Sequence, residues 1–226
     1  MNTYRNRGEV ANKGDTLRAP KREEESQLIK DELDLARKLK KSMAFDFREV
    51  FDNINLASKK FYPYWKKWHG EPVFSAQPQI DLMFVTTNLQ LLAVELKYFR
   101  KTKEGKIKNP FYAGIGEALA LLRFGFSAVS LWHFFDEKLD REYYERLYGN
   151  CFSLINYLDL PINYQGYRVF QDNEQLEFGV LYLGGEAEIR DLPSPYGGGD
   201  NPCESKPNAR RVQNMLRSFY RIPHPE

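Results

Sequence analysis

The chain has 226 residues, of which 42% are hydrophobic and 28% charged, and its net charge is +2. This composition is typical of a globular protein, and so small a net charge excludes attraction of a polyanion by the overall field alone. No stretch approaches 18 consecutive apolar residues, and the start of the chain lacks the apolar segment of a signal peptide. Two cysteines, Cys151 and Cys203, are too few for a zinc or iron–sulfur framework. We therefore expect an intracellular, cytoplasmic protein with no membrane partner.

The first part of the chain combines a polar arm with segments of helical periodicity. Residues 1–21 bury little and are expected to form a mobile arm ahead of a domain at 22–190. Apolar residues at helical spacing predict an amphipathic helix at 22–43 and a second helix at about 46–60. Aromatic residues alternate with lysines at 61–70. Such a segment can stack bases and hold phosphates, but more often it forms a packed corner with lysines reaching into water.

The most informative stretch is 79–97, where two apolar runs flank a polar turn, as in an antiparallel hairpin. If the hairpin is symmetric about Asn88, Asp81 faces Glu95 directly, with Cβ atoms ~5 Å apart. Lys97 lies two residues beyond Glu95 and therefore on the same face of the sheet. The sequence thus predicts two carboxylates and an ammonium group together at the open end of a hydrophobic hairpin.

This predicted cluster has an electrostatic cost. Two carboxylates ~4 Å apart repel by roughly 4 kcal/mol at an effective dielectric constant near 20. One of them could take up a proton, Lys97 could partly neutralise both, or a divalent cation could bridge them. Mg²⁺ suits the last arrangement, because it binds through one or two carboxylates and keeps its other positions for water and substrate phosphate. A small salt-bridge cluster at the mouth of a sheet is the simpler alternative.

A buried crossover follows the hairpin. Residues 91–96 are apolar on both faces, and they lead through a basic loop into a glycine-rich helix at 111–124 and a second buried strand at 127–135. This order predicts a right-handed crossover between parallel strands. Glu117 is a costly residue in that apolar helix, unless it faces outward, and His133 is expected to be a hydrogen-bonded core histidine. The basic residues of the loop that could contact phosphate are Arg100, Lys101, Lys103, Lys106 and Lys108.

The remaining elements extend the domain. A helix is expected at 137–158, and strands are expected at 167–170 and 176–183. Proline and glycine mark residues 191–207 as a linker. Beyond it, 208–226 contains a short basic helix whose Arg210 and Arg211 could dock on nucleic acid or on a partner subunit; packing back on the domain is the alternative.

The order of these motifs resembles the PD-(D/E)XK, or restriction-endonuclease-like, nuclease superfamily. The matching residues are Asp81, then Glu95-Leu96-Lys97, then the glycine-rich helix that carries Glu117. The resemblance covers about 46–135, and it departs from the family pattern where Gln79-Ile80 precedes Asp81 in place of proline. It implies an α/β (α+β) fold with a central mixed β-sheet flanked by helices.

The resemblance also implies an activity. It implies Mg²⁺- or Mn²⁺-dependent hydrolysis of DNA phosphodiester bonds, with the metal held by Asp81, Glu95 and the Leu96 backbone carbonyl. Lys97 would orient or deprotonate the attacking water, and Glu117 would assist. A glutamate on the first core helix is common in the family, and Glu49 is the best candidate for it.

The partners and alternatives follow from the same resemblance. DNA is the expected partner, and a homodimer would supply the two sites needed to cut both strands. A non-catalytic nucleic-acid-binding or assembly protein with the same fold is the alternative. A hydrolase or transferase of small phosphorylated compounds is disfavoured and no organic cofactor is expected, because the sequence has no P-loop and no dinucleotide glycine fingerprint.

Overall fold

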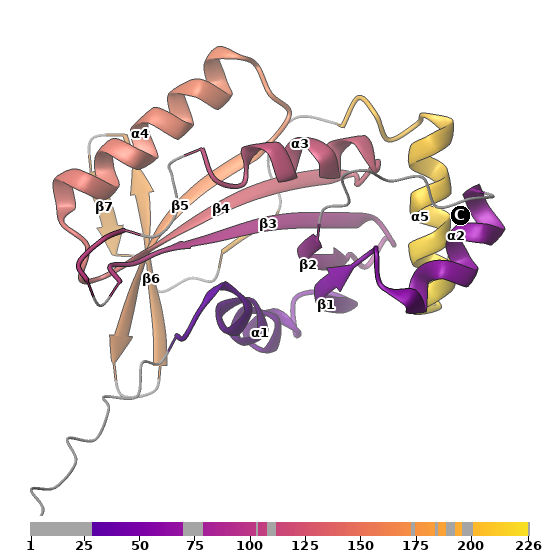
Figure 1. Cartoon of the computed structure of the whole chain (residues 1–226), viewed down its shortest axis with the longest axis horizontal. Helices are drawn as coiled ribbons and strands as arrows, with labels where there is room; N and C mark the ends of the chain where they lie inside the picture. The colour runs from indigo at the N-terminus through magenta and orange to yellow at the C-terminus, as the bar shows by residue number, and fades with distance from the viewer. Residues whose placement is uncertain are drawn as a thin grey trace, which may run out of the picture.

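The computed structural model describes residues 29–69, 79–102, 104–107, 112–172, 175–183, 185–188, 193–195 and 201–225. Its centre is a seven-stranded mixed sheet whose strands lie side by side in chain order (Figure 1). The middle of the sheet is parallel and both sides are antiparallel. The strands are β1 (Glu49–Asn55), β2 (Gln79–Val85), β3 (Leu91–Phe99), β4 (Ala128–Asp136), β5 (Asn163–Asp172), β6 (Gln175–Tyr182) and β7 (Gly185–Glu188).

Helices cover both faces of the sheet, so the predicted α/β class is confirmed. On one face lies α1, and on the other lie α3 and α4, while α2 and α5 pack together at one end of the molecule (Figure 1). None of the helices in the described part of the chain is long and apolar enough to cross a membrane. The helices are α1 (Glu32–Met43), the short 3₁₀ helix η1 (Lys59–Phe61), α2 (Tyr62–His69), α3 (Ile115–Arg123), α4 (Arg141–Tyr157) and α5 (Pro207–Tyr220).

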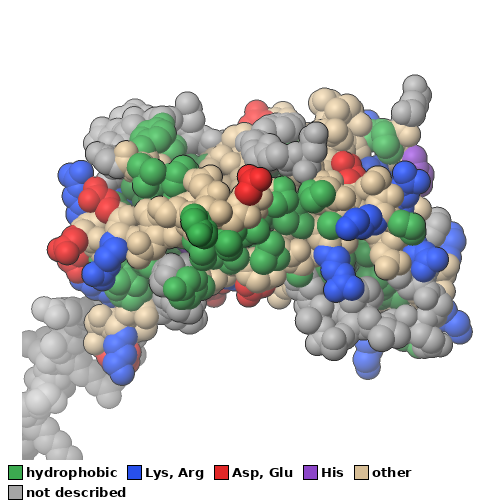
Figure 2. Space-filling view, turned by 90° about the horizontal axis from the view of Figure 1, so that it is seen from above, with side chains coloured by type: hydrophobic (Ala, Val, Ile, Leu, Met, Phe, Trp, Pro, Cys, Tyr) green, Lys and Arg blue, Asp and Glu red, His purple; other side chains and the backbone are tan. Residues whose placement is uncertain are grey.

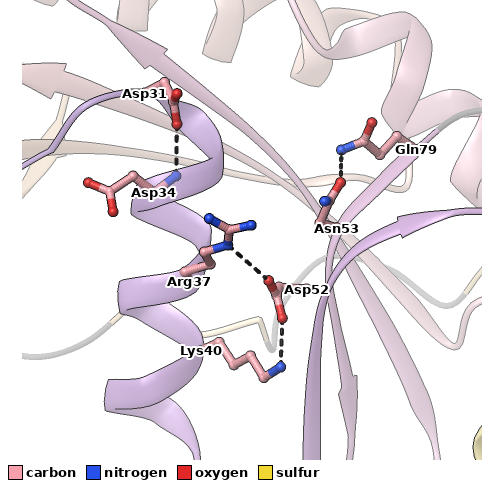
Figure 3. A network of polar contacts seen from close by, with 7 residues as sticks. All are labelled: Asp31, Asp34, Arg37, Lys40, Asp52, Asn53 and Gln79. Carbon is pink, nitrogen blue, oxygen red and sulfur yellow. Dashed lines mark hydrogen bonds and ion pairs between the residues drawn. The ribbon is translucent and has the colours of Figure 1, made fainter.

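Helix α1 is the described part of the predicted helix at 22–43, whose first residues lie outside the described residues. It begins at Asp31, whose carboxylate accepts the backbone N–H of Asp34 at 2.9 Å, as a good N-cap does. Its buried side lies on the sheet, and Asp52 of β1 pairs with Lys40 at 2.6 Å and with Arg37 at 4.0 Å (Figure 3). Apolar contact and these ion pairs together fix the helix against the first strand.

The predicted helix at 46–60 is wrong, because this stretch forms strand β1. Its apolar residues fit a helical period, but the β-branched Val50 and Ile54 also favour a strand, and both are buried there. Strand β1 pairs with β2 from Glu49 opposite Val85 to Asn55 opposite Gln79. The ladder satisfies the backbone groups of β2, which would otherwise form an unpaired edge, so long-range pairing decides the structure of this segment.

The hairpin of β2 and β3 has the register that the sequence predicts. Val85 pairs with Leu91 and Leu82 pairs with Val94, which is the symmetry about Asn88. The turn is closed by hydrogen bonds from the Thr86 N–H to the Gln90 carbonyl and from the Leu89 N–H to the Thr86 carbonyl, each 3.0 Å long. A slip of one residue would have put Asp81 and Glu95 on opposite faces.

The crossover from β3 through α3 to the parallel β4 is also as predicted. Helix α3 is shorter than expected and only one side of it is buried, through Ala118, Leu121 and Leu122. The predicted strands at 167–170 and 176–183 form parts of β5 and β6, whereas β7 has no counterpart in the sequence prediction. Helix α5 packs back on the domain, where Met215 and Leu216 are fully buried in the main core.

Candidate functional site

Glu95 and Lys97 lie on the sheet face that α3 covers, and Asp81 lies near both of them. The Lys97 Nζ donates to Glu95 Oε1 at 2.5 Å, and the Glu95 side chain is almost completely buried. The Asp81 carboxylate accepts the backbone N–H of Leu96 at 2.8 Å. The hairpin therefore assembles the three predicted side chains, and we call them the carboxylate cluster.

The cluster forms where β2 and β3 stop pairing through their backbones. The paired register ends at Leu82 and Val94, one residue short of Asp81 and Glu95. Beyond that point the Asp81 side chain, and not the backbone of β2, accepts the N–H of Leu96. This substitution keeps the buried N–H satisfied and places a carboxylate between the two strands. The metal-binding role of the Leu96 carbonyl stays a prediction.

Burial and neighbouring charges shift the pKa values of all three ionisable groups of the cluster. Burial outweighs the Leu96 and Lys97 contacts and, with smaller contributions from the Glu32 and Glu117 charges, raises the pKa of Asp81 to about 6. Burial and the neighbouring Asp81 raise the pKa of Glu95 even further. Burial alone would lower the pKa of Lys97, but the adjacent Glu95 carboxylate has the larger effect and raises the pKa of Lys97 above its ordinary value. The ammonium group is therefore held protonated beside carboxylates that resist ionisation.

One oxygen of the cluster has no partner within the described part of the chain. Glu95 Oε2 is buried and makes no hydrogen bond there. A buried carboxylate oxygen without a donor is costly, and a cation can satisfy it. Among the described residues no group of three or more His, Cys, Asp or Glu side chains could hold a metal ion. Asp81 and Glu95 nevertheless fit Mg²⁺, which needs only one or two carboxylates when water and phosphate complete its shell.

The beginning of helix α3 lies directly on the cluster. Gly114 has φ +89°, and a Cβ atom added there would lie 2.5 Å from Leu131 Cδ1 and 3.2 Å from Lys97 Cγ. Only glycine accommodates both this backbone conformation and this contact. The close approach of the helix backbone to the cluster thus occurs at Gly114, whereas Gly116 has open space beside it.

Glu117 lies in the first turn of α3 and is exposed to solvent. Its charge contributes to raising the pKa values of both Asp81 and Glu95, so it lies near the carboxylate cluster. It makes no described hydrogen bond to these residues. The structure therefore places Glu117 at the rim of the cluster.

Glu49 does not join the cluster, and Glu32 lies where a further acidic residue was expected. Glu49 begins β1 opposite Val85, which is about 13 Å along β2 from Asp81 at 3.3 Å per residue. Glu32 is the first residue of α1 and accepts the backbone N–H of Tyr98 at 3.3 Å, and its charge acts on both Asp81 and Lys97. The sequence offered no signal that singles out Glu32, because several acidic residues precede the hairpin.

His133 lies beside the cluster on the neighbouring strand β4. It is registered beside Lys97, and its Nε2 and Nδ1 lie 3.0 Å from the Ala113 carbonyl and the Tyr164 hydroxyl. Complete burial lowers the pKa of His133 to about 4, so the ring is neutral near pH 7. A neutral ring fits these partners, with Nε2–H donating to Ala113 and Nδ1 accepting from Tyr164. This predicted core histidine therefore fixes the residue that precedes Gly114.

The predicted basic residues fall into separate places. Lys101 pairs with Asp140 at 2.9 Å, where α4 begins, and Lys106 is exposed on the same loop. Arg100 is half-buried. Lys103 and Lys108 lie outside the described residues. Arg210 and Arg211 lie on α5 and are not brought to the carboxylate cluster.

Comparison of the chain with protein-family models and with curated proteins finds no match.

Proposed function

We propose that the chain is a Mg²⁺- or Mn²⁺-dependent nuclease that hydrolyses DNA phosphodiester bonds, as an endonuclease. The observation that carries the proposal is Glu95 Oε2, a buried carboxylate oxygen without a partner among the described residues, beside Asp81 and Lys97. A cation held there would relieve the repulsion between the carboxylates. DNA as the substrate rests on the resemblance to the PD-(D/E)XK superfamily.

Each residue of the carboxylate cluster then has a role. Asp81 and Glu95 would hold the cation, which when bound polarises the phosphate and lowers the pKa of a water molecule. Asp81 is held for this purpose by the Leu96 N–H at 2.8 Å. The neighbouring Glu95 keeps Lys97 protonated, so Lys97 would donate hydrogen bonds to the attacking water or to a phosphate oxygen. We therefore favour orientation and charge stabilisation by Lys97 over removal of a proton.

Helix α3 would close the site from above. Gly114 packs on Glu95 and Lys97 without room for a side chain, and His133 holds the preceding carbonyl. These contacts limit the motion of the two reacting side chains, because the packed backbone leaves them few rotamers. Fixed geometry of this kind is what catalysis by orientation requires.

The test is cleavage of DNA by the purified protein. Supercoiled, linear, single-stranded and four-way-junction DNA would be incubated with EDTA, Mg²⁺ or Mn²⁺. We expect cleavage with a divalent cation and none in EDTA, lost in the Glu95→Gln and Lys97→Met variants. Glu145→Gln, which removes an exposed charge on α4, is the matched control. Wild-type rates in both cluster variants would overturn the proposal, and binding of DNA without any product would favour a non-catalytic nucleic-acid-binding protein.

A further inference from the structure

Positive charge is concentrated at the end of the molecule that carries α2 and α5. The segments 56–69 and 204–221 hold nine of the 33 basic residues and only one of the 31 acidic residues. The rest of the chain is therefore net negative, although the whole chain is +2. Figure 2 shows several Lys and Arg side chains at this end. We call these two helices, with η1, the α2–α5 pair.

The α2–α5 pair is a packed unit. The ring of Phe219 lies 4.1 Å from that of Phe61 and 5.1 Å from that of Tyr64, measured between centroids. These contacts, and burial of the inner side of α5, direct the basic side chains outward. The exposed basic residues of the pair that form no ion pair with a described acidic residue include Lys59, Lys60, Lys66, Lys206, Arg210, Arg211 and Arg221.

The chemistry of this surface favours a phosphodiester backbone over a lipid surface. A helix that lies on a membrane inserts a broad apolar side between the lipids. The apolar residues of α5, including Val212 and Met215, are buried in the protein core. Among the side chains of α2 that the structure describes, Tyr62, which is 51% exposed, is the large hydrophobic residue left in solvent. A surface of cations with little exposed apolar area suits a polyanion, whose bound counterions such cations release.

The position of the pair relative to the carboxylate cluster is fixed by contacts of α5. The Arg217 Nη2 donates to the Leu89 carbonyl at 2.7 Å, and the Gln213 amide donates to the Gly125 carbonyl. Leu89 lies six residues before Glu95, so the cluster lies at most about 20 Å from it at 3.3 Å per residue. That upper limit corresponds to about six base pairs of duplex DNA at 3.4 Å each.

A groove of about 730 Å³ lies between the end of α3 and the beginning of α5. Its lining is mainly apolar, with Leu119, Leu122 and several prolines, and it carries two cations, Arg123 of α3 and Lys206 before α5. Helix α3 begins at the carboxylate cluster and ends at this groove. The surface along α3 therefore connects the cluster with the first cations of the α2–α5 pair.

We propose that the α2–α5 pair binds the phosphodiester backbone of a nucleic acid, within about six base pairs of the bond that lies at the carboxylate cluster. The location of the reacting bond rests on the proposed function, whereas binding by the pair does not. The two parts can therefore fail separately.

The test compares two triple variants that lose the same charge. Lys66→Gln/Arg210→Gln/Arg211→Gln removes three exposed cations from the pair, and Lys41→Gln/Lys138→Gln/Arg146→Gln removes three exposed cations elsewhere. Affinity for a fluorescent 30-base-pair DNA is measured in EDTA between 50 and 200 mM salt. Each phosphate contact makes the slope of log K against log salt steeper by about 0.9. If all three residues contact phosphates, the slope of the first variant is therefore shallower than that of wild type by about 2.7. We also expect its binding to be at least tenfold weaker. The control retains the wild-type slope.

Each outcome decides a different part. Equal slopes in the two triple variants would overturn the docking role, whether or not the protein cleaves DNA. Loss of binding in the first variant alone, in a protein that never cleaves, would uphold the docking role and reject the nuclease. Duplex RNA in place of DNA distinguishes the two nucleic acids. Binding of the pair to phosphatidylserine vesicles and not to either nucleic acid would overturn the proposal.

Discussion

The carboxylate cluster and the α2–α5 pair handle charge in opposite ways. At the carboxylate cluster, Glu95 and Asp81 are withdrawn from water, share one ammonium group and leave an oxygen without a described partner. At the α2–α5 pair, Arg210 and Arg211 project into solvent. Buried charges interact strongly, and their interaction energy depends on the neighbouring groups. Exposed cations each contribute a weak, roughly additive attraction, which salt screens. The first arrangement suits chemistry on one bond, and the second suits retention of a long polyanion.

The largest expected effect is the loss of cleavage activity when the carboxylate cluster is changed. Lys97→Met keeps the length of the side chain but removes the ammonium group beside Glu95. We expect the cleavage rate to fall by about 10²–10³, the usual loss for one donor that stabilises developing charge. Single-turnover cleavage measures the rate, and thermal melting checks that the variant is folded. A rate within twofold of wild type would show that the ammonium group has no part in the reaction.

The next effect tests how closely α3 lies on the carboxylate cluster. Gly114→Ala forces a Cβ atom to within 2.5 Å of Leu131 and keeps a positive φ angle, so we expect a loss of about 2–4 kcal/mol in the free energy of unfolding. Gly116→Ala is the matched control in the same helix, where a Cβ atom meets nothing within 4 Å. We expect it to stabilise the protein by about 0.5–1 kcal/mol. Urea unfolding measures both, and equal effects would contradict the close approach.

A smaller effect concerns how the free energy of unfolding of the metal-free protein depends on pH. Because folding raises the pKa of Asp81 to about 6, its contribution to stability is fully present below about pH 4 and is lost as the pH rises through 6. Asp81→Asn removes this loss and still offers an oxygen to the Leu96 N–H. In EDTA at pH 8 we expect the variant to be more stable than wild type by about 1–2 kcal/mol, with the difference disappearing towards pH 4. Higher stability of wild type at pH 8 would contradict the account of buried repulsion.

The smallest effect concerns an exposed ion pair. Lys101 and Asp140 lie 2.9 Å apart, but both side chains are well exposed. Lys101→Ala should change the free energy of unfolding by less than about 0.5 kcal/mol, because such pairs contribute little in water. Urea unfolding at low and high salt measures it. A change of several kcal/mol would mean that this loop is part of the packed structure.

The sequence predicted the local geometry of the carboxylate cluster better than its surroundings. The proximity of Asp81 to Glu95 follows from a short hairpin, in which the turn and the alternation of side chains determine the register. By contrast, the middle of the 46–60 segment, residues 49–55, pairs with β2 across the chain, and its apolar spacing fits both a helix and a strand. Glu32 reaches the cluster only because α1 packs on the sheet, and His133 acts through a backbone carbonyl, so neither contact is visible in local sequence.

The most direct test of the central claim is a calorimetric titration of the protein with Mn²⁺ at pH 7.5, carried out in two buffers with different ionisation enthalpies. Cation binding at the carboxylate cluster requires Glu95 to lose its proton, so we expect one site in wild type, with proton release, and no comparable site in Glu95→Gln. Equal binding by wild type and Glu95→Gln would contradict the claim that these carboxylates hold the metal.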